Sequence, residues 1–170
     1  MSYQIEIRCP TCEKIAYSFE VMMDDFGYGL SKRRVTLSTS GVVPMLDKLG
    51  DVSEVSLAVS LHAPNDALRN ELVPINRRYP IAELLAACRR YLDKQPDKHR
   101  VVTVEYTLIA GVNDSMDQAR ELAQVLRDLP CKVNLIPFNP FSLSDYQRPS
   151  KSAVSRFWQV MTDAGYVTTV

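Results

Sequence analysis

The sequence predicts an α/β protein with a mostly parallel sheet, and two observations indicate this class. From about residue 33, short runs rich in β-branched residues alternate with amphipathic stretches of helical period. Three of these runs also end in polar residues, which is typical of strands that lead into a ligand-binding edge. Alternation of this kind is expected of βα units, whose strands pair in parallel. A chain of 170 residues is about one domain and can bury a sizeable core.

Five runs are expected to form strands, because each is short, apolar and rich in β-branched residues. They cover residues 34–37, 55–61, 101–109, 132–136 and 166–170. The runs are nearly continuously apolar, which predicts strands that are covered on both faces.

Three segments carry an apolar stripe at helical spacing and are expected to be amphipathic helices. The stripes cover residues 81–92, 116–126 and 154–161. Asp114 or Ser115 is expected to cap the second helix, and Gly165 fits a left-handed stop after the third. A shorter helix is expected to begin after a cap at Asn65 or Asp66.

The first 21 residues follow a different pattern, so we expect a division into residues 1–21 and 22–170. Apolar residues alternate with polar ones on both sides of Cys9-Pro10-Thr11-Cys12. This predicts an N-terminal β-hairpin around a CxxC knuckle, either unrelated to the rest of the chain or divergent. Cys9 and Cys12 are two of the four ligands that a closed zinc site needs, and no second pair is evident. A zinc-knuckle nucleic-acid binder stays open as an alternative.

Composition narrows the class of protein. Lysine plus arginine and aspartate plus glutamate each number 20, so net charge does not favour nucleic acid or a membrane. No apolar stretch approaches the roughly 20 residues that span a bilayer, and the start lacks a signal-peptide pattern. Four cysteines are too few for a disulfide framework, which favours a reduced, cytoplasmic location. The oligomeric state is left open.

Polar residues gather where three of the expected strands end. They are Ser38 after the first run, Ser60 and His62 at the end of the second, and Asn139 after the fourth. Because carboxyl ends of parallel strands meet at one edge, these side chains predict a ligand that makes many hydrogen bonds. A serine hydrolase fits less well, because Ser60 and His62 are two residues apart on a strand and no G-x-S-x-G elbow is present. Helix-capping serines and a half-buried histidine are the other alternative.

Four strings extend this interpretation. They are DDFGYGLSKRRVTLSTSG at residues 24–41, SLHAPND at 60–66, VPIN at 73–76 and CKVNLIPFNPF at 131–141. Together they resemble the bacterial radical-SAM RNA methyltransferases that methylate C2 of adenosine in 23S rRNA and tRNA. The likeness runs from about residue 21 to residue 170.

The resemblance implies a partial (β/α) barrel of the radical-SAM type, with S-adenosylmethionine lying across its carboxyl rim. It implies that Ser38 binds this cofactor, as do Ser60, Leu61 and His62 from the second motif and Asn139 from the third. It also implies that the basic residues Lys32, Arg33 and Arg34 contact the RNA backbone, because contacts to phosphate groups dominate the affinity of proteins for nucleic acids. The implied partners are 23S rRNA and tRNA, and no association with a membrane is expected.

Other parts of the family pattern do not occur in these 170 residues. The CxxxCxxC motif that holds the family's [4Fe–4S] cluster, and the Gly-Glu-Pro motif, are both absent. The family's methyl-carrying cysteine lies beyond the last strand. We therefore expect a carboxy-side portion of an enzyme that is inactive alone, with no catalytic residue of its own. The alternatives are an inactive remnant that binds S-adenosylmethionine or RNA, and a cluster-free barrel enzyme that uses His62 as a base.

Overall fold

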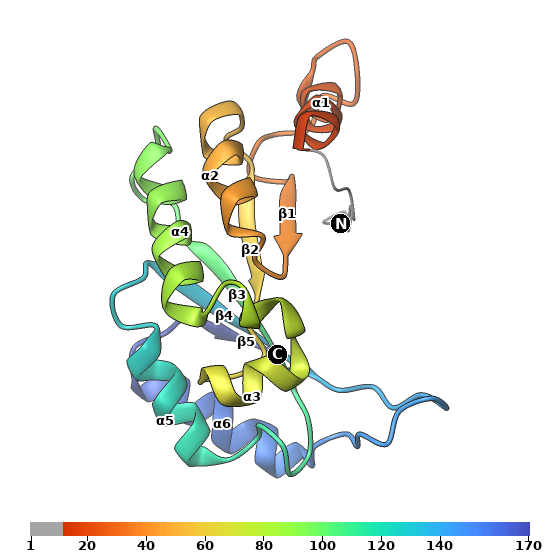
Figure 1. Ribbon diagram of the computed structural model, residues 1–170, viewed down its shortest axis with the longest axis vertical. Helices are drawn as coiled ribbons and strands as arrows, with labels where there is room; N and C mark the ends of the chain where they lie inside the picture. The colour runs from red at the N-terminus through yellow and green to blue at the C-terminus, as the bar shows by residue number, and fades with distance from the viewer. Residues whose placement is uncertain (1–11) are drawn as a thin grey trace.

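A computed structural model describes residues 12–170 of the chain, with side chains described from residue 17 onward. Helices and strands alternate along the chain (Figure 1). In order they are α1 (Cys12–Met23), β1 (Thr36–Thr39), α2 (Val43–Val52), β2 (Ser56–Ser60), α3 (Asp66–Leu72), the 3₁₀ helix η1 (Pro74–Arg77), α4 (Ile81–Lys94), β3 (Val102–Leu108), α5 (Met116–Val125), β4 (Cys131–Pro137), α6 (Lys151–Asp163) and β5 (Thr168–Thr169).

The strands form one sheet in the order β1-β2-β3-β4-β5, and every neighbouring pair is parallel. The α/β class with a parallel sheet is therefore confirmed. Each expected strand is present with its ends moved by a few residues, and the last is reduced to Thr168–Thr169. Among residues 12–170, none of the helices combines the length and hydrophobicity that crossing a bilayer requires.

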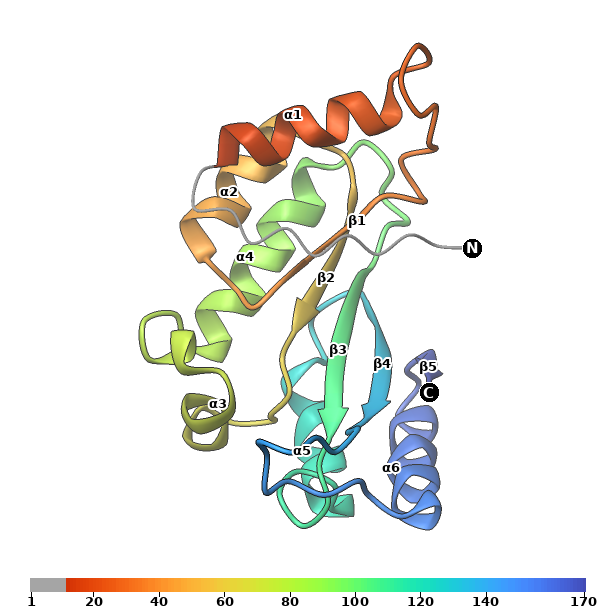
Figure 2. The same cartoon turned by 90° about the vertical axis from the view of Figure 1, so that its right-hand side faces the viewer.

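The two faces of this sheet differ in chemistry, so the prediction of strands covered on both faces was wrong. Alternate side chains of a strand point to opposite faces. On β3, Val102, Val104 and Tyr106 are buried on one face, whereas Thr103 and Thr107 are only half-buried on the other. Helices α2 and α4 lie on one side of the strands in Figure 1, and Figure 2 looks onto the other side. The sheet therefore has an apolar covered face and a polar face.

The core lies between the apolar face and the helices. Tyr106 of β3 and Phe157 of α6 are fully buried, with ring centroids 5.2 Å apart. Leu84 of α4 packs beside Gly41, which follows β1 with a φ of 103°. Burying one leucine side chain contributes roughly 2 kcal/mol, so the apolar stripes predicted from sequence hold the helices on this face. Cys88 is buried within the stripe of α4 as a small apolar residue.

The helix caps follow the sequence pattern. Ser115 caps α5 in a capping box with Gln118. Asn65 caps α3 by accepting from the Leu68 amide at 3.0 Å. Gly165 follows α6 with a φ of 93°, as expected of a left-handed stop.

The predicted N-terminal hairpin is wrong in its second half. Residues Cys12–Met23 form α1 instead of a strand. Phe19 is buried in the core and Met22 and Met23 pack against it, at the i, i+3 and i+4 spacing of a helix face. Tyr17 and Val21, which suggested a strand by alternation, are exposed. The first half of the hairpin and Cys9 lie outside the described residues, and the boundary at residue 21 stays a prediction.

Candidate ligand site at the carboxyl rim

Ser38 and Ser60 are brought together by a carboxylate that lies one strand further along the sheet. Glu105 Oε2 on β3 accepts from Ser38 Oγ at 2.8 Å and from Ser60 Oγ at 3.3 Å. Strand register pairs Ser60 with Glu105 directly, whereas Ser38 lies on β1, with β2 between. The β2 residue aligned with Ser38 is Ala58, whose methyl group leaves room for the carboxylate to reach across.

His62 lies just beyond β2 in a conformation that the sequence did not indicate. Its φ is 59°, in the left-handed region that residues other than glycine seldom adopt. Two contacts hold it there. The Thr107 amide donates to His62 Nδ1 at 3.0 Å, and the Asn113 side chain donates to the His62 carbonyl at 2.8 Å. Asn113 also donates to the Thr107 carbonyl at 2.7 Å, so one buried amide fixes the whole turn against the end of β3.

The environment of His62 makes it neutral. Burial lowers the pKa of the imidazole to about 4, and the charge of Arg69 acts in the same direction, while Glu105 partly opposes both. Because Nδ1 accepts a hydrogen bond, the ring proton is on Nε2, which makes His62 a hydrogen-bond donor. A general base needs a free basic nitrogen, and the Ser60 hydroxyl bonds to Glu105. The geometry therefore favours a binding role over a hydrolase.

Arg69 holds the ends of β1 and β2 together through hydrogen bonds to their backbone. Its guanidinium donates to the carbonyl oxygens of Ser40 at 2.8 Å, Ser60 at 3.1 Å and Leu61 at 3.1 Å. A fourth bond, 2.9 Å long, goes to Asn76 Oδ1 in the VPIN string. Burial lowers the pKa of Arg69 to about 10, so it remains a cation at neutral pH. This fully buried arginine joins three of the four sequence strings, those at 24–41, 60–66 and 73–76.

Leu61, which the resemblance assigns to the cofactor, is held by backbone hydrogen bonds. Its amide donates to the Glu105 carbonyl at 3.0 Å. Its carbonyl accepts from Arg69, and its side chain is buried. Leu61 therefore fixes the spacing of Ser60 and His62.

Asn139 follows β4 on an exposed segment. The Phe138 amide still donates to the Leu108 carbonyl at 2.9 Å, which keeps Asn139 at the same edge as the end of β3. Phe138 also contacts the rings of Phe141 and Tyr146, which anchor the segment. Within residues 17–170, no hydrogen bond joins Asn139 to Ser38, Ser60 or His62. The structure places Asn139 on the predicted edge without bringing it into contact with the others.

The basic cluster lies at the opposite edge of the sheet. Lys32, Arg33 and Arg34 precede β1, so they are at the amino ends of the parallel strands. Lys32 pairs with Glu54 at 2.6 Å and Arg33 with Asp97 at 3.4 Å. Arg33 also lines a pocket of about 340 Å³, together with Thr36, Ser56, Thr103, Arg100 and Lys132. Any RNA that these residues contact is therefore at the edge away from Ser38.

The described cysteines do not fit an iron–sulfur cluster. Burial raises the pKa of Cys88 and of Cys131 to about 12, so both are thiols, whereas cluster ligands are thiolates. Between residues 17 and 170, no three histidine, cysteine or acidic side chains come together as a metal site.

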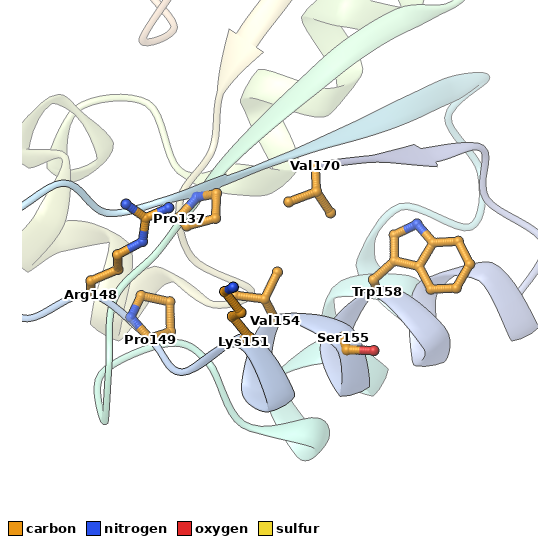
Figure 3. Close-up of a pocket in the computed structure, with 8 residues that line it drawn as sticks. All are labelled: Pro137, Arg148, Pro149, Lys151, Val154, Ser155, Trp158 and Val170. Atoms are coloured by element: carbon orange, nitrogen blue, oxygen red, sulfur yellow. The ribbon is translucent and has the colours of Figure 1, made fainter.

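A hollow of about 460 Å³ lies outside the predicted site, between the end of β4 and the start of α6. Figure 3 shows Arg148 and Pro149 toward one end and Trp158 at the other. None of the residues predicted to bind the cofactor lines it. The candidate site at the ends of β1 and β2 is thus separate from this hollow.

Sequence reasoning missed three buried polar residues that build this edge: Glu105, Arg69 and Asn113. All three are almost fully buried. The sequence did contain a clue to Glu105, because it is the one acidic residue in the apolar run 101–109. A buried acid needs partners, and here the structure supplies two serine hydroxyls.

Comparison with known proteins gives a consistent result. The family model described as "Radical SAM superfamily" matches residues 10–123, which includes part of the segment that we set apart. The chain is 64% identical over 158 residues to the dual-specificity RNA methyltransferase RlmN of Marinobacter nauticus. It is 61% identical to the protein of the same name from Saccharophagus degradans. Both matches cover 93% of this chain, but the chain spans only 42% and 40% of those relatives.

Solved structures agree with the predicted fold. A crystal structure of a radical SAM methyltransferase from Sphaerobacter thermophilus superposes with a TM-score of 0.87 at 50% identity. That match covers 93% of this chain and 46% of the other, which confirms the partial barrel. A domain of pyruvate-formate lyase-activating enzyme from Bacteroides vulgatus matches with a TM-score of 0.70, over 96% of this chain and 95% of that one. At 18% identity, this second likeness shows the fold alone.

Proposed function

The chain belongs to the radical SAM superfamily, and we propose that it is the carboxy-side portion of a radical-SAM RNA methyltransferase that holds part of the S-adenosylmethionine site. The observation that carries this proposal is the single polar edge formed by Ser38, Ser60 and His62. Glu105 joins the two serines, and Thr107 fixes the imidazole beside them. Asn139 completes the proposed set from the end of β4.

The chemistry of these residues suits the cofactor. S-adenosylmethionine carries ribose hydroxyls, an adenine edge and a charged amino-acid end, all of which need hydrogen-bond partners. The serine oxygens accept, the His62 Nε2–H donates, and the Asn139 amide does both. When bound in the complete enzyme, the cofactor supplies the methyl group and the radical. The residues of this chain bind and orient it, with Leu61 setting the spacing between Ser60 and His62.

The proposed substrates are 23S rRNA and tRNA, with methylation at C2 of adenosine. Support comes from the resemblance of the motifs and from the names of the relatives, which are dual-specificity RNA methyltransferases. We propose that Lys32, Arg33 and Arg34 contact the RNA backbone at the amino edge, remote from the cofactor. A cytoplasmic location goes with this function, because ribosomes and tRNA are there.

Calorimetric titration of the 170-residue chain with S-adenosylmethionine tests the cofactor site. We expect measurable binding, and a loss of about three- to tenfold in affinity for Ser38→Ala and for Ser60→Ala, because each removes one hydrogen bond. Ser56→Ala is the matched control, since Ser56 is on the same face of β2, four residues before the rim. Absence of binding by the unchanged chain, or an equal loss in the control, contradicts the cofactor site.

We also propose that the chain alone does not methylate RNA. The thiols of Cys88 and Cys131 are protonated, and the sequence lacks a CxxxCxxC motif. After anaerobic reconstitution with iron and sulfide, the purified chain should leave an rRNA fragment unmethylated. Transfer of label from S-adenosylmethionine to that fragment would refute this. A cluster-free enzyme that uses His62 as a base is the second candidate, but the engaged Nδ1 and the lowered pKa of His62 argue against it.

A further inference from the structure

The segment that joins β4 to α6 carries large apolar side chains that face solvent. Residues 138–150, which we call the rim loop, extend away from the body of the molecule in Figure 1. In Figure 2 they pass the carboxyl ends of β3 and β4. Phe141 is 59% exposed, Leu143 92% and Tyr146 42%. Exposed apolar side chains gathered on one loop indicate an interaction surface.

The rim loop is anchored at both ends, so its exposed rings are held in place. Phe138 is half-buried, and its ring centroid lies 6.0 Å from those of Phe141 and Tyr146. The first pair is tilted and the second is edge-on. The Ala110 amide donates to the Gln147 carbonyl at 3.0 Å, which ties the loop to the turn after β3. Rings that are positioned in advance lose little freedom on binding.

Two cations lie beside these rings without a protein partner. Arg148 and Lys151 are exposed, and both line the hollow drawn in Figure 3. Neither side chain makes an ion pair or a hydrogen bond with any atom that the structure describes. Asp145 is the one acidic residue between positions 137 and 151, so this stretch carries a net charge of +1. The loop therefore offers positive charge to a partner.

The position of the rim loop matters for the proposed reaction. The cofactor is proposed to lie at the carboxyl ends of β1 and β2, and the loop passes the carboxyl ends of β3 and β4 in the same sheet. The base that is modified has to reach the edge where the cofactor is bound. Lys32 and Arg33 lie at the opposite edge and are already paired with Glu54 and Asp97. They cannot present the base to the cofactor.

Exposed rings beside unpaired cations suit single-stranded RNA. An adenine that is modified at C2 has to leave its base stack, and an aromatic side chain can replace the stacking that it loses. Stacking on one ring raises affinity by roughly tenfold, and it tolerates any base because every base has a flat face. The cations favour RNA over a segment of protein, because a phosphate backbone supplies negative charge at regular spacing.

We infer that the rim loop is a binding surface for single-stranded RNA, in which the rings of Phe141 and Tyr146 stack on bases next to the target adenosine. Arg148 and Lys151 contact the phosphate groups of the same stretch. This inference rests on the proposed function, since it takes the carboxyl edge as the place where RNA and cofactor meet. It separates two tasks: residues 32–34 hold the RNA backbone, and the rim loop presents the base.

Fluorescence anisotropy of the 170-residue chain with a labelled, adenine-containing single-stranded RNA of about ten nucleotides tests the surface. We expect the double variant Phe141→Ala, Tyr146→Ala to lose affinity by about tenfold or more, because it removes two rings. Leucine at both positions keeps the apolar area without the rings and should lose nearly as much. The matched control replaces Phe26 and Tyr28 by alanine, an exposed phenylalanine and tyrosine that precede β1 at the opposite edge.

The charge of the surface has a separate measurement. Replacing Arg148 and Lys151 together by glutamine should lower the slope of log affinity against log salt by about 1.4, since each phosphate contact contributes about 0.7. The same variant should bind S-adenosylmethionine as the unchanged chain does, because neither residue is part of the proposed cofactor site. An unchanged slope would mean that these cations do not contact phosphate.

The outcomes separate this surface from the proposed cofactor site. Absence of RNA binding by the unchanged chain, unchanged affinity in the alanine variant, or an equal loss in the Phe26 and Tyr28 control each overturns the inference, whatever the cofactor titration gives. RNA affinity that is unchanged while solubility rises identifies the loop as a surface for another protein segment. RNA binding through the rings without binding of S-adenosylmethionine sinks the cofactor site alone. Should the double variant not fold, Phe141→Ala alone decides by the same measure.

Discussion

The backbone amide of Thr107 donates to Nδ1 of His62 across 3.0 Å, from the end of one strand to the turn that follows its neighbour. A protonated imidazole has no lone pair at Nδ1, so this bond exists only in the neutral ring. Burial acts in the same direction and lowers the pKa of His62 to about 4. Folding of the rim is therefore coupled to the protonation of one side chain.

Stability should fall as the pH decreases from 7 to 4. The pKa of His62 is about 4 in the folded chain and about 6.5 in the unfolded chain. Between these values the unfolded chain binds a proton that the folded chain does not, so acid favours unfolding. We expect His62 to contribute a loss of about 3 kcal/mol over this range. Urea unfolding at several pH values measures it.

His62→Asn is the matched variant for this measurement. Asparagine tolerates a positive φ, and its side-chain oxygen can replace Nδ1 as the acceptor, but it does not titrate. The variant should therefore lose stability less steeply with acid than the unchanged chain. Identical pH profiles for the two proteins would show that His62 does not titrate in this way.

Asn113→Ala should destabilise the fold strongly. Asn113 is fully buried and donates to the carbonyls of His62 and Thr107, and its Oδ1 accepts from the Ile109 amide at 2.7 Å. Removing the side chain leaves these groups unsatisfied in the interior, which costs about 3 kcal/mol or more. Chemical denaturation measures the loss. Asn139→Ala is the control, because Asn139 is exposed and its removal should change stability by less than about 0.5 kcal/mol; equal losses contradict the prediction.

Gly41→Ala should be more damaging than Gly111→Ala, although both glycines have a positive φ. A Cβ at Gly41 lies 2.8 Å from Leu84 Cδ1, whereas a Cβ at Gly111 meets nothing within 4 Å. We expect about 1 kcal/mol of conformational strain at Gly111, and a further 1–3 kcal/mol, roughly, at Gly41 from the clash. Thermal unfolding of the two variants compares them. If Gly111→Ala loses as much stability as Gly41→Ala, the positive φ alone accounts for the loss and the clash with Leu84 contributes nothing.

Replacing Lys32, Arg33 and Arg34 together by alanine should weaken binding of a single-stranded rRNA fragment and reduce the salt dependence of that binding. Removing one lysine or arginine from a phosphate group lowers the slope of log affinity against log salt by about 0.7. Fluorescence anisotropy at several salt concentrations gives the slope. Replacing Arg89 and Arg90 on α4 by alanine is the control. An equal effect of that replacement on RNA binding would show that the binding depends on overall positive charge and not on Lys32, Arg33 and Arg34.

The elements could be predicted because their signals are local. The apolar stripes of α4, α5 and α6 record which helix face is buried, and caps such as Ser115 depend only on nearby residues. The N-terminal segment shows where local signals mislead. Tyr17, Phe19 and Val21 alternate as a strand does, but the packing of Phe19 in the core makes the segment a helix. Tertiary packing overrides a short alternation.

The residues of the candidate site could be predicted only in part, for a related reason. Ser38, Ser60 and His62 were proposed because polar residues at strand ends share an edge in a parallel sheet. Glu105, Arg69 and Asn113 were missed because each has a partner that is distant in the sequence, 67, 29 and 51 residues away respectively. The hydrogen bond of the Leu61 amide could not be predicted for the same reason, since only the register of β2 against β3 shows that the Glu105 carbonyl accepts from it.

The sequence alone determined the α/β class, the order of the five strands and the three strand ends that form the rim, because these depend on periodicity and on neighbouring residues. The tertiary structure alone decided the chemistry of that rim. Strand register brought one carboxylate within reach of Ser38 and Ser60, and close packing of the His62 turn against the end of β3 made its imidazole neutral. The direction of a hydroxyl proton and the charge of a buried ring depend on distances between strands, and those distances exist only once the chain has folded.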